Sequence, residues 1–487
     1  MTTPKPPPPQ TSTSTQTLVQ RALGGHAAIG LLASALLYLI ALSGSVIVIH
    51  DRWQRWEQPQ VPEMATLSPA AAQAAMIAGL AQGKNAPTAH LTIRLPTAGL
   101  PRATVTTDAG TWYVDAQGRA AARQTPGWTE FVVALHEYLH LPQTWGLMLV
   151  GALGVALAAL AVTGVLAHPR ILRDAFRLRP RHPAQIAHAD WHNRLGVWTL
   201  PFALAVATTG AFLGMSGIGA TVLARAYTGG DLAKVYAPVF GGEAAPDTAP
   251  APLPDVAAAL RTLARRVPAA MPTYVIVHDP RTRGQHIQIF AELPRRLIYG
   301  ESYQFDAAGR FTGRAGMSDG ALGQQAAASA YNLHFGNYGG LVVEIAYVGL
   351  GLALCVITAT GTTLWLAKRR RRGLGGSRLA AGWAAIVWGT PLLLIGTLWL
   401  RVIGGPAAPV VAVFWLGLAA LLVVAAVAPA RIRAGWLQRG TFVGLAVTGV
   451  AHAAVYGSVV ADVVAIDAAL VVIGVAALAA LRTGRRA

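Results

Sequence analysis

The sequence predicts an integral membrane protein, an α-helical bundle of about eight spans with two inserted α+β external domains. Of its 487 residues, 54% are hydrophobic and 12% are charged, about half the charged fraction of a soluble domain. Several apolar stretches reach the roughly 20 residues that a helix needs to cross a bilayer core. A helix–domain–helix unit also occurs twice along the chain. These observations together argue against an ordinary soluble enzyme.

The predicted spans follow one another in two groups, separated by hydrophilic insertions. The insertions cover residues 51–135 and 216–333. Each contains an Ala-rich helical stretch followed by alternating strand-like segments, which is the pattern of a small α+β domain. The apolar stretches between and after them are long enough to cross a bilayer. They lie near 27–49, 145–167, 195–215, 341–367, 382–402, 408–428, 441–460 and 463–481.

Basic residues predict the orientation of the bundle. Lys and Arg number 39 against 21 Asp and Glu, which gives a net charge of +18. They gather in the 168–191 connection, at 368–372, at 431–439 and at the C-terminal end, all on one side of an even number of spans. The positive-inside rule places that side, and both termini, in the cytoplasm. The charge is therefore a topology signal, and no nucleic-acid partner is expected.

The same landmarks divide the chain into five parts. Residues 1–20, rich in Pro, Ser and Thr, are expected to form a disordered cytoplasmic tail. Residues 21–167 form the first repeat, 168–191 a basic cytoplasmic connection, and 192–372 the second repeat. Residues 373–487 lack the repeated pattern and are expected to form a C-terminal module of about four further spans.

The duplication is visible in matched landmarks. His26 opens the first span and is followed by Gly44 after 18 residues, and His192 is followed by Gly210 at the same spacing. Each insertion ends in strand-like segments joined by Asp-x-x-Gly, at 115–118 and 306–309, which predicts a hairpin turn.

A Leu-His pair then precedes each return span and supplies His136 and His334. The duplication therefore predicts two pairs of imidazoles, His26 with His192 near the cytoplasmic face and His136 with His334 near the opposite face. An ionisable residue near a span usually faces the bundle interior with a partner. Two facing imidazoles suit the iron of a b-type haem, so two such haems are predicted. Small residues would let a flat macrocycle approach: Gly30, Gly44, Gly164, Gly196, Gly210 and Gly361.

Two other observations bear on the metal site. The single cysteine, Cys355, excludes a covalently attached c-type haem and a multi-cysteine metal site. His140 is an alternative to His136, because it lies four residues later and would share its face of a helix. Alignment of the repeats on the Thr-Gly pair at 163–164 favours His136, whereas alignment on Gly146 favours His140. Both are kept as candidate ligands.

At this point the pattern resembles a known family. The segment 190–196, Asp-Trp-His-Asn-Arg-Leu-Gly, and the segment 333–340, which has the form Leu-His-x-Gly-x-x-Gly-Gly, are similar to motifs of the bacterial PepSY-associated transmembrane proteins. The resemblance covers roughly residues 20–372. It implies that the insertions are PepSY-like periplasmic domains and that the chain is similar to inner-membrane dihaem ferric-siderophore reductases. The extra His140 and the C-terminal module depart from that pattern.

The resulting expectation is a transmembrane oxidoreductase. An electron from a quinol or a cytoplasmic donor would pass through the two haems to a ferric siderophore or other ferric chelate in the periplasm, releasing Fe²⁺ for iron uptake. Two alternatives remain open. The first is a non-enzymatic membrane protein that binds peptides, inhibits a protease or senses a ligand. The second is a permease for iron or its siderophore.

Overall fold

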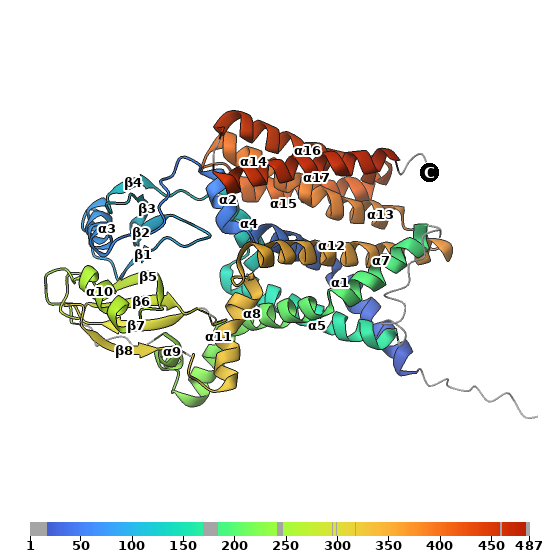
Figure 1. Cartoon of the computed structure of the whole chain (residues 1–487). Coiled ribbons are helices and arrows are strands. Elements are labelled where there is room, and N and C mark those ends of the chain that lie inside the picture. Colours follow the sequence, from blue (N-terminus) through green and yellow to red (C-terminus); the bar gives the residue numbers. More distant parts are fainter. Residues whose placement is uncertain are drawn as a thin grey trace, which may run out of the picture.

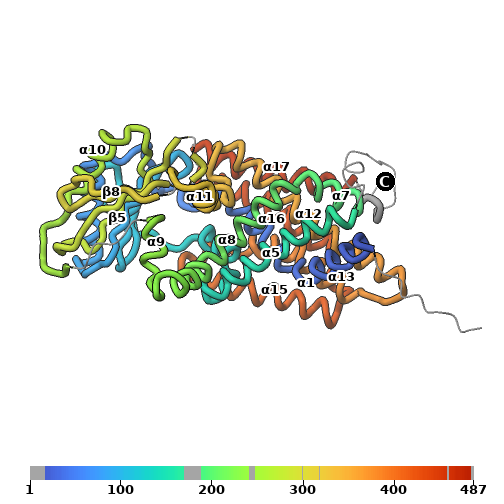
Figure 2. The backbone as a smooth tube through the Cα atoms, turned by 90° about the horizontal axis from the view of Figure 1, so that it is seen from below, coloured from blue at the N-terminus to red at the C-terminus, as the bar shows by residue number. Residues whose placement is uncertain are grey.

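The computed structural model describes residues 17–168, 184–240, 247–294, 296–298, 300–316, 318–457 and 460–483. Most of the predicted tail at 1–20 and of the basic connection at 168–191 lies outside these residues. The described chain forms a long helical bundle with a β-sheet and its helices at one end (Figure 1). The first turns of α1 and the last turns of α17 lie at the other end, away from the sheet (Figures 1 and 2).

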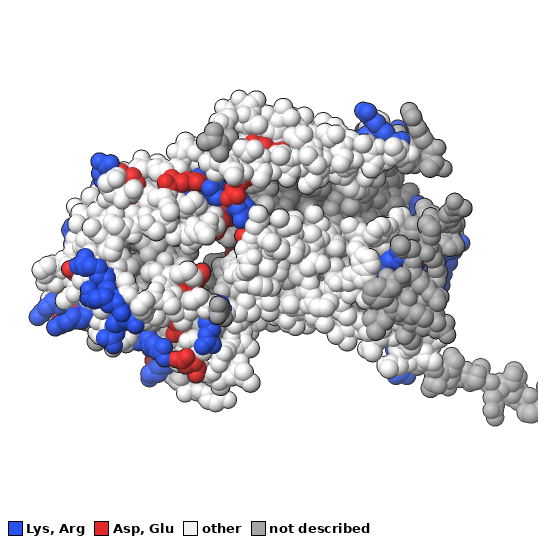
Figure 3. Space-filling view, viewed as in Figure 1, with Lys and Arg blue, Asp and Glu red and all other residues white. Residues whose placement is uncertain are grey.

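Seven described helices are long and apolar enough to cross a membrane, which confirms a multi-pass membrane protein. On the face that Figure 3 shows, the middle of the bundle is largely free of charged side chains, while these gather over the sheet. The seven are α1 (Leu18–Ile47), α5 (Gln143–Ala167), α8 (Leu200–Tyr227), α12 (Gly340–Arg371), the segment Ser377–Gly404, α15 (Val410–Val427) and α17 (Ala461–Thr483).

The predicted span at 441–460 corresponds to α16 (Ala434–Tyr456), which is not among the seven. Its 23 residues are long enough, but Gln438, Arg439 and His452 make it less apolar. α16 packs alongside α17 in the bundle (Figure 1). The segment Ser377–Gly404 is itself divided into α13 (Ser377–Ala384), a π-helical turn (Ala385–Gly389) and α14 (Thr390–Gly404), with a proline in the first turn of α14.

His192 lies on a separate short helix rather than at the start of the third span. This helix, α7 (Ala184–Trp198), is separated from α8 by the single residue Thr199. Pro201 occupies the first turn of α8. A proline has no N–H to donate and its ring clashes with the preceding turn, so a continuous helix is broken there.

The two insertions form one continuous antiparallel sheet, in the order β4-β3-β2-β1-β5-β6-β7-β8. Each insertion contributes a helix followed by four consecutive strands. The first contributes α3 (Pro69–Gln82), β1 (His90–Arg94), β2 (Ala103–Thr107), β3 (Gly110–Val114) and β4 (Ala120–Arg123). The second contributes α10 (Val256–Arg266), β5 (Met271–His278), β6 (His286–Glu292), β7 (Glu301–Phe305) and β8 (Phe311–Ala315).

The seam between the insertions is the pairing of β1 with β5, which runs in register from His90 opposite His278 to Arg94 opposite Tyr274. Side chains of both insertions share one hydrophobic core under α3 and α10, including the fully buried Met76 and Ile289. The sequence predicted two α+β domains, and the structure joins their strands. A shared sheet buries apolar surface from both insertions and removes one edge from each.

Both predicted Asp-x-x-Gly turns are confirmed. Residues 115–118 join β3 to β4 and residues 306–309 join β7 to β8. In the first turn the carboxylate of Asp115 accepts hydrogen bonds from the amides of Gln117 and Arg119, both at 2.9 Å. Gly118 has φ of +78°, a conformation that favours glycine, and its Cα lies against the backbone of α3 at Ala71.

Four further helices connect the sheet to the bundle. They are α2 (His50–Glu57), α4 (Trp128–Tyr138), α9 (Leu232–Phe240) and α11 (Leu322–Phe335). α4 and α11 occupy equivalent places in the two repeats, each between the last strand of an insertion and the return span. Helices α13 to α17, the C-terminal module, pack on one side of the bundle (Figure 1).

Candidate functional site

The histidines predicted near the cytoplasmic face meet in space. His26 on α1 and His192 on α7, here called the inner pair, have ring centroids 6.3 Å apart and planes at 83°. The Nδ1 atom of His26 lies 3.1 Å from the carbonyl oxygen of Leu160, and that of His192 lies 2.9 Å from the carbonyl oxygen of Ile357. Each imidazole is therefore tied to a helix of its own repeat.

The histidines predicted near the opposite face also meet. His136 on α4 and His334 on α11, here called the outer pair, have ring centroids 6.1 Å apart and planes at 35°. The Nδ1 atom of His136 lies 2.9 Å from the carbonyl oxygen of Ile40, and that of His334 lies 3.0 Å from the hydroxyl oxygen of Thr209. The structure thus brings together the four histidines in the combination that the duplication predicts.

These contacts fix the tautomer of the rings. A carbonyl oxygen can only accept, so the proton of the neutral imidazole must sit on Nδ1. The nearby hydroxyls donate to their own helices, as Thr163 does to Ala159 at 2.6 Å, and so also accept from Nδ1. Nε2 then carries a lone pair, and among the described residues no hydrogen bond reaches it. This is the arrangement in which a protein holds an imidazole for a metal ion.

A hydroxyl followed by glycine faces every one of the four rings. A Cβ added to Gly44 would lie 2.7 Å from Cε1 of His136, and one added to Gly210 would lie 2.9 Å from Cε1 of His334. For Gly361 and His192 the distance is 3.0 Å. Only glycine leaves room for an imidazole this close to a helix axis. The pairs are Ser43-Gly44, Thr163-Gly164, Thr209-Gly210 and Thr360-Gly361, and each hydroxyl lies within 3.4 Å of the histidine's Nδ1.

Two of the predicted glycines do not take part. A Cβ on Gly196 would meet nothing within 4 Å, and one on Gly30 would meet only Leu160 at 3.6 Å. The roles of the four hydroxyls, in contrast, were missed by the sequence analysis. The sequence signal for them is a Ser or Thr directly before each of the four glycines that recur in the repeat.

His140 lies apart from the outer pair. α4 ends at Tyr138, and Leu139 and His140 both have φ of +55°. The argument that His140 shares a helical face with His136 therefore does not hold, because the helix has ended. Its Nε2 contacts the carbonyl oxygen of Phe131 at 2.9 Å, and its Nδ1 accepts a hydrogen bond from Trp415 at 3.2 Å. Both nitrogens of His140 are thus engaged, and His136 is the ring that faces His334.

The geometry of the pairs fits a haem iron. Imidazole nitrogen binds a transition metal at about 2 Å, so two rings on opposite sides of one ion have centroids roughly 6 Å apart. Both pairs meet that separation. In the described residues no group of three or more His, Cys, Asp or Glu could hold a metal ion by itself. Two axial nitrogens suit an ion whose remaining ligands come from a macrocycle.

A cavity of about 360 Å³ adjoins the outer pair. Its walls are apolar side chains and glycines of α1, α5, α8 and α12, as expected for a site that takes a flat apolar group. Polar groups of α4 and α11 also line it, namely Glu137 and Tyr331. Burial raises the pKa of the Glu137 carboxyl above its usual value.

Comparison with known proteins identifies the family of the chain. The family model described as the PepSY-associated TM region matches residues 24–368, which include all four paired histidines and end before the C-terminal module. The chain is also similar to the uncharacterized protein PA4219 of Pseudomonas aeruginosa. The two are 28% identical over 269 residues, which cover 52% of this chain and 68% of that protein. The family match spans more than half of the chain, and the chain therefore belongs to the PepSY-associated TM family.

Proposed function

We propose that the chain is a transmembrane electron conduit that holds two b-type haems and reduces a ferric siderophore or other ferric chelate. The observation that carries this proposal is the pair of histidine pairs, each with centroids near 6 Å and Nε2 directed away from its hydrogen-bonded Nδ1. A haem bound by such a pair takes up and gives up one electron. The enzyme would be an oxidoreductase of iron uptake.

The chain's own residues orient the ligands. Hydrogen bonds at Nδ1 hold each ring in one tautomer and one rotamer, which keeps Nε2 available. The glycines let each ring lie against a helix, and apolar side chains line the outer cavity. The residues that would hold the haems are His26 with His192 and His136 with His334.

The spacing of the two sites along the bundle suits a route across a membrane. His26 lies on α1, and His136 packs against Gly44 on the same helix, 18 residues further along. At 1.5 Å per residue this places the pairs about 27 Å apart along the axis, close to the roughly 30 Å of a bilayer core. The two sites would then serve opposite faces of the membrane.

The proposed direction of transfer follows from orientation. With both termini on the cytoplasmic side of a bacterial inner membrane, the inner pair would meet a quinol or cytoplasmic donor and the outer pair would face the periplasm. Hard oxygen chelators hold the softer Fe²⁺ less tightly than Fe³⁺, so one electron delivered there favours release. The sheet lies beyond the outer pair, on the side where the chelate would arrive.

Visible spectroscopy of the purified protein tests the proposal. We expect reduced b-haem bands with about two haems per chain by pyridine haemochrome, and loss of about one haem in His192→Ala and in His334→Ala. His140→Ala tests the alternative ligand and should retain both haems, because both nitrogens of His140 are engaged by Phe131 and Trp415. Adding a ferric chelate to the reduced protein should reoxidise the haems. Colourless protein after expression with ample haem would refute the conduit and favour a peptide-binding or sensing role.

A further inference from the structure

The helix that carries His136 is packed between the cavity and the C-terminal module. Trp128, Phe131 and Leu135 of α4 are almost fully buried. Trp128 donates a hydrogen bond from Nε1 to the hydroxyl of Thr397 on α14 at 3.1 Å. The ring of Phe131 packs edge-on against Phe414 on α15, with centroids 5.7 Å apart. One side of α4 therefore rests on the module while His136 points away from it.

The end of α4 is held in the same way. Trp415 on α15 donates from Nε1 to Nδ1 of His140 at 3.2 Å, and His140 in turn bonds the carbonyl of Phe131. The ring of His140 also stacks on Phe131, at 4.8 Å between centroids. The spare histidine of the first repeat is thus part of the contact between α4 and the module.

The start of α4 is held through α2. The carboxylate of Glu57, the last residue of α2, accepts hydrogen bonds from the amides of Trp128 at 2.6 Å and Thr129 at 3.1 Å. These amides belong to the first turn of α4, where a helix has no internal acceptor for its N–H groups.

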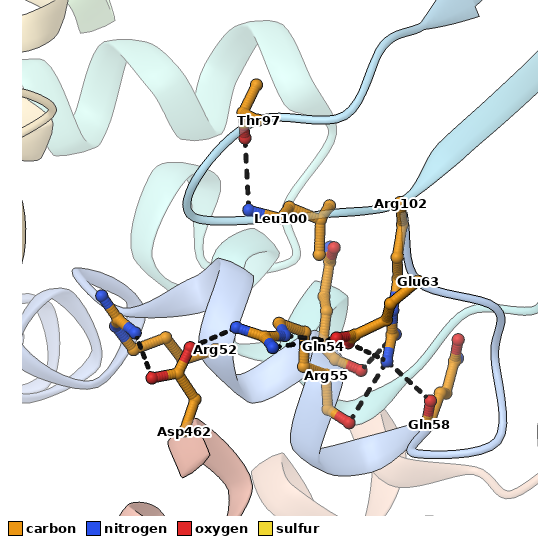
Figure 4. Close-up of polar contacts among 9 residues, drawn as sticks. All are labelled: Arg52, Gln54, Arg55, Gln58, Glu63, Thr97, Leu100, Arg102 and Asp462. Carbon is orange, nitrogen blue, oxygen red and sulfur yellow. Dashed lines mark hydrogen bonds and ion pairs between the residues drawn. The ribbon is translucent and has the colours of Figure 1, made fainter. Parts of the chain in front are cut away.

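The C-terminal module contacts α2 at two places. Asp462 of α17 binds both Arg52 and Arg55, and Figure 4 shows these contacts. Nearby, Trp56 donates from Nε1 to the carboxylate of Asp467 at 2.8 Å and stacks on His452 at 3.9 Å between centroids. Residues of α16 and α17 thus fix the helix whose last residue caps α4.

The equivalent helix of the second repeat is held differently. α11 carries His334, and only Ala330 and Asn332 are buried within it. It packs on α8, and its carbonyl at Leu333 accepts from the hydroxyl of Tyr347 at 2.7 Å. The inner pair lies at the opposite end of the bundle from α2 and α4. The contacts described above therefore act on one ligand of one pair.

We propose that the C-terminal module is a positioning element for the outer pair. Its positioning residues for His136 are Trp415 and Thr397, and Glu57 of α2, the helix that the module holds, is a third. The effect of this positioning on electron transfer rests on the proposed function. Rotation or tilt of α4 would move Nε2 of His136 relative to His334. A change of axial ligand geometry alters the electronic signature and potential of a bound haem.

The test compares Trp415→Phe with Trp399→Phe in the full-length haem-loaded protein. Both variants keep an aromatic ring, but Trp399 donates to Thr448 inside the module, so only the first loses a bond to the α4 end. Electron paramagnetic resonance and redox titration would follow the two haems separately, with His334→Ala marking the outer signal. We expect Trp415→Phe to shift the outer signal and potential only, and Trp399→Phe to shift neither. Equal shifts of both haems, or none, would overturn the proposal.

A second readout does not depend on haem. Amide hydrogen exchange of α4, with α11 as the internal reference, should become about fivefold faster in Trp415→Phe, because one net hydrogen bond of about 1 kcal/mol is lost. Thr397→Val should act in the same direction through Trp128. Unchanged exchange in α4 in both variants would overturn the positioning role. A protein without haem would refute the proposed function alone, and the exchange measurement would still decide this inference.

Discussion

At the scale of single residues, one small unit occurs four times: a histidine, a helix carbonyl or hydroxyl at its Nδ1, and a glycine under the ring. The histidines could be predicted because the duplication repeats them at fixed spacing. The roles of the hydroxyls were not predicted, because Ser and Thr in helices usually bond their own backbone, as Ser43 does to Leu39 at 2.7 Å. The sequence could not decide between His136 and His140, because the choice depends on where α4 ends. Leu139 and His140 end it in the left-handed conformation, which tertiary contacts determine.

The glycines give the first prediction. Gly44→Ala would place a methyl group 2.7 Å from Cε1 of His136, so the ring must move. The proposed outer haem should then be lost or its spectrum altered. Gly164→Ala, where the same distance is 3.3 Å, should perturb the inner haem less. Gly217→Ala is the control, because a Cβ there meets nothing within 4 Å. Haem content of the purified variants measures the effect. Equal haem content in Gly44→Ala and Gly217→Ala would contradict the packing argument.

At the scale of helices and strands, the sequence predicts what local composition determines. The long apolar spans and the two hairpin turns are such elements. The break between α7 and α8 has a local cause in Pro201, although the uniform apolar pattern hid it. The pairing of β1 with β5 joins residues about 180 positions apart, such as Ile93 and Val275, so no local pattern could reveal the shared sheet.

The cap of α4 gives a prediction on pH. Burial is the main cause that raises the pKa of Glu57 to about 7, although hydrogen bonds from Thr129 oppose the shift. The folded state therefore holds this proton more tightly than the unfolded state, whose pKa is near 4.5. Stability should be highest below about pH 4.5 and fall as the pH rises to about 7, by on the order of 3 kcal/mol from this group.

Glu57→Gln keeps an acceptor for the amides of α4 but cannot ionise. Its Tm should therefore change less between pH 5 and pH 7 than that of the wild type. Asp231→Asn provides the control, because it removes an exposed carboxyl that lies outside the contact between α2 and α4. Parallel curves for Glu57→Gln and the wild type would show that Glu57 does not titrate in this range.

At the scale of the whole molecule, α2 joins three parts: the sheet domain, the repeated bundle and the C-terminal module. Arg52 binds Glu344 of α12 as well as Asp462 of α17, and Arg55 binds Asp462 as well as Glu63 (Figure 4). The guanidinium of Arg102, whose side chain is 1% exposed, reaches Glu63 at 3.1 Å. The charges of this joint come from segments hundreds of residues apart, so no local sequence pattern could pair them.

Removing the shared acid should loosen this joint. Asp462→Asn removes the shared carboxylate of two largely buried guanidinium groups. Each keeps one other acidic partner, so the cost should be about 2 kcal/mol. Asp231→Asn removes an exposed partner of Lys234 and should cost less than about 1 kcal/mol. Thermal unfolding in detergent would measure both. Equal Tm values for the two variants would mean that the joint contributes nothing to stability.

The orientation of the molecule gives the last prediction. The first turns of α1 and the end of α17 lie at the end of the bundle away from the sheet, so the termini and the sheet should face opposite compartments (Figure 1). The lone Cys355 is buried, and Cys355→Ser provides a background for single new cysteines. Gln117 is exposed in the turn between β3 and β4, and Arg372 is exposed after α12. Gln117→Cys and Arg372→Cys therefore provide one labelling site at each end of the molecule. A membrane-impermeant maleimide added to intact spheroplasts should label position 117 and not position 372, whereas permeabilised cells should show both labelled. Labelling of position 372 alone in intact spheroplasts would mean that the orientation is the reverse of the one proposed. The outer pair would then face the cytoplasm, where it could not reduce a periplasmic ferric chelate.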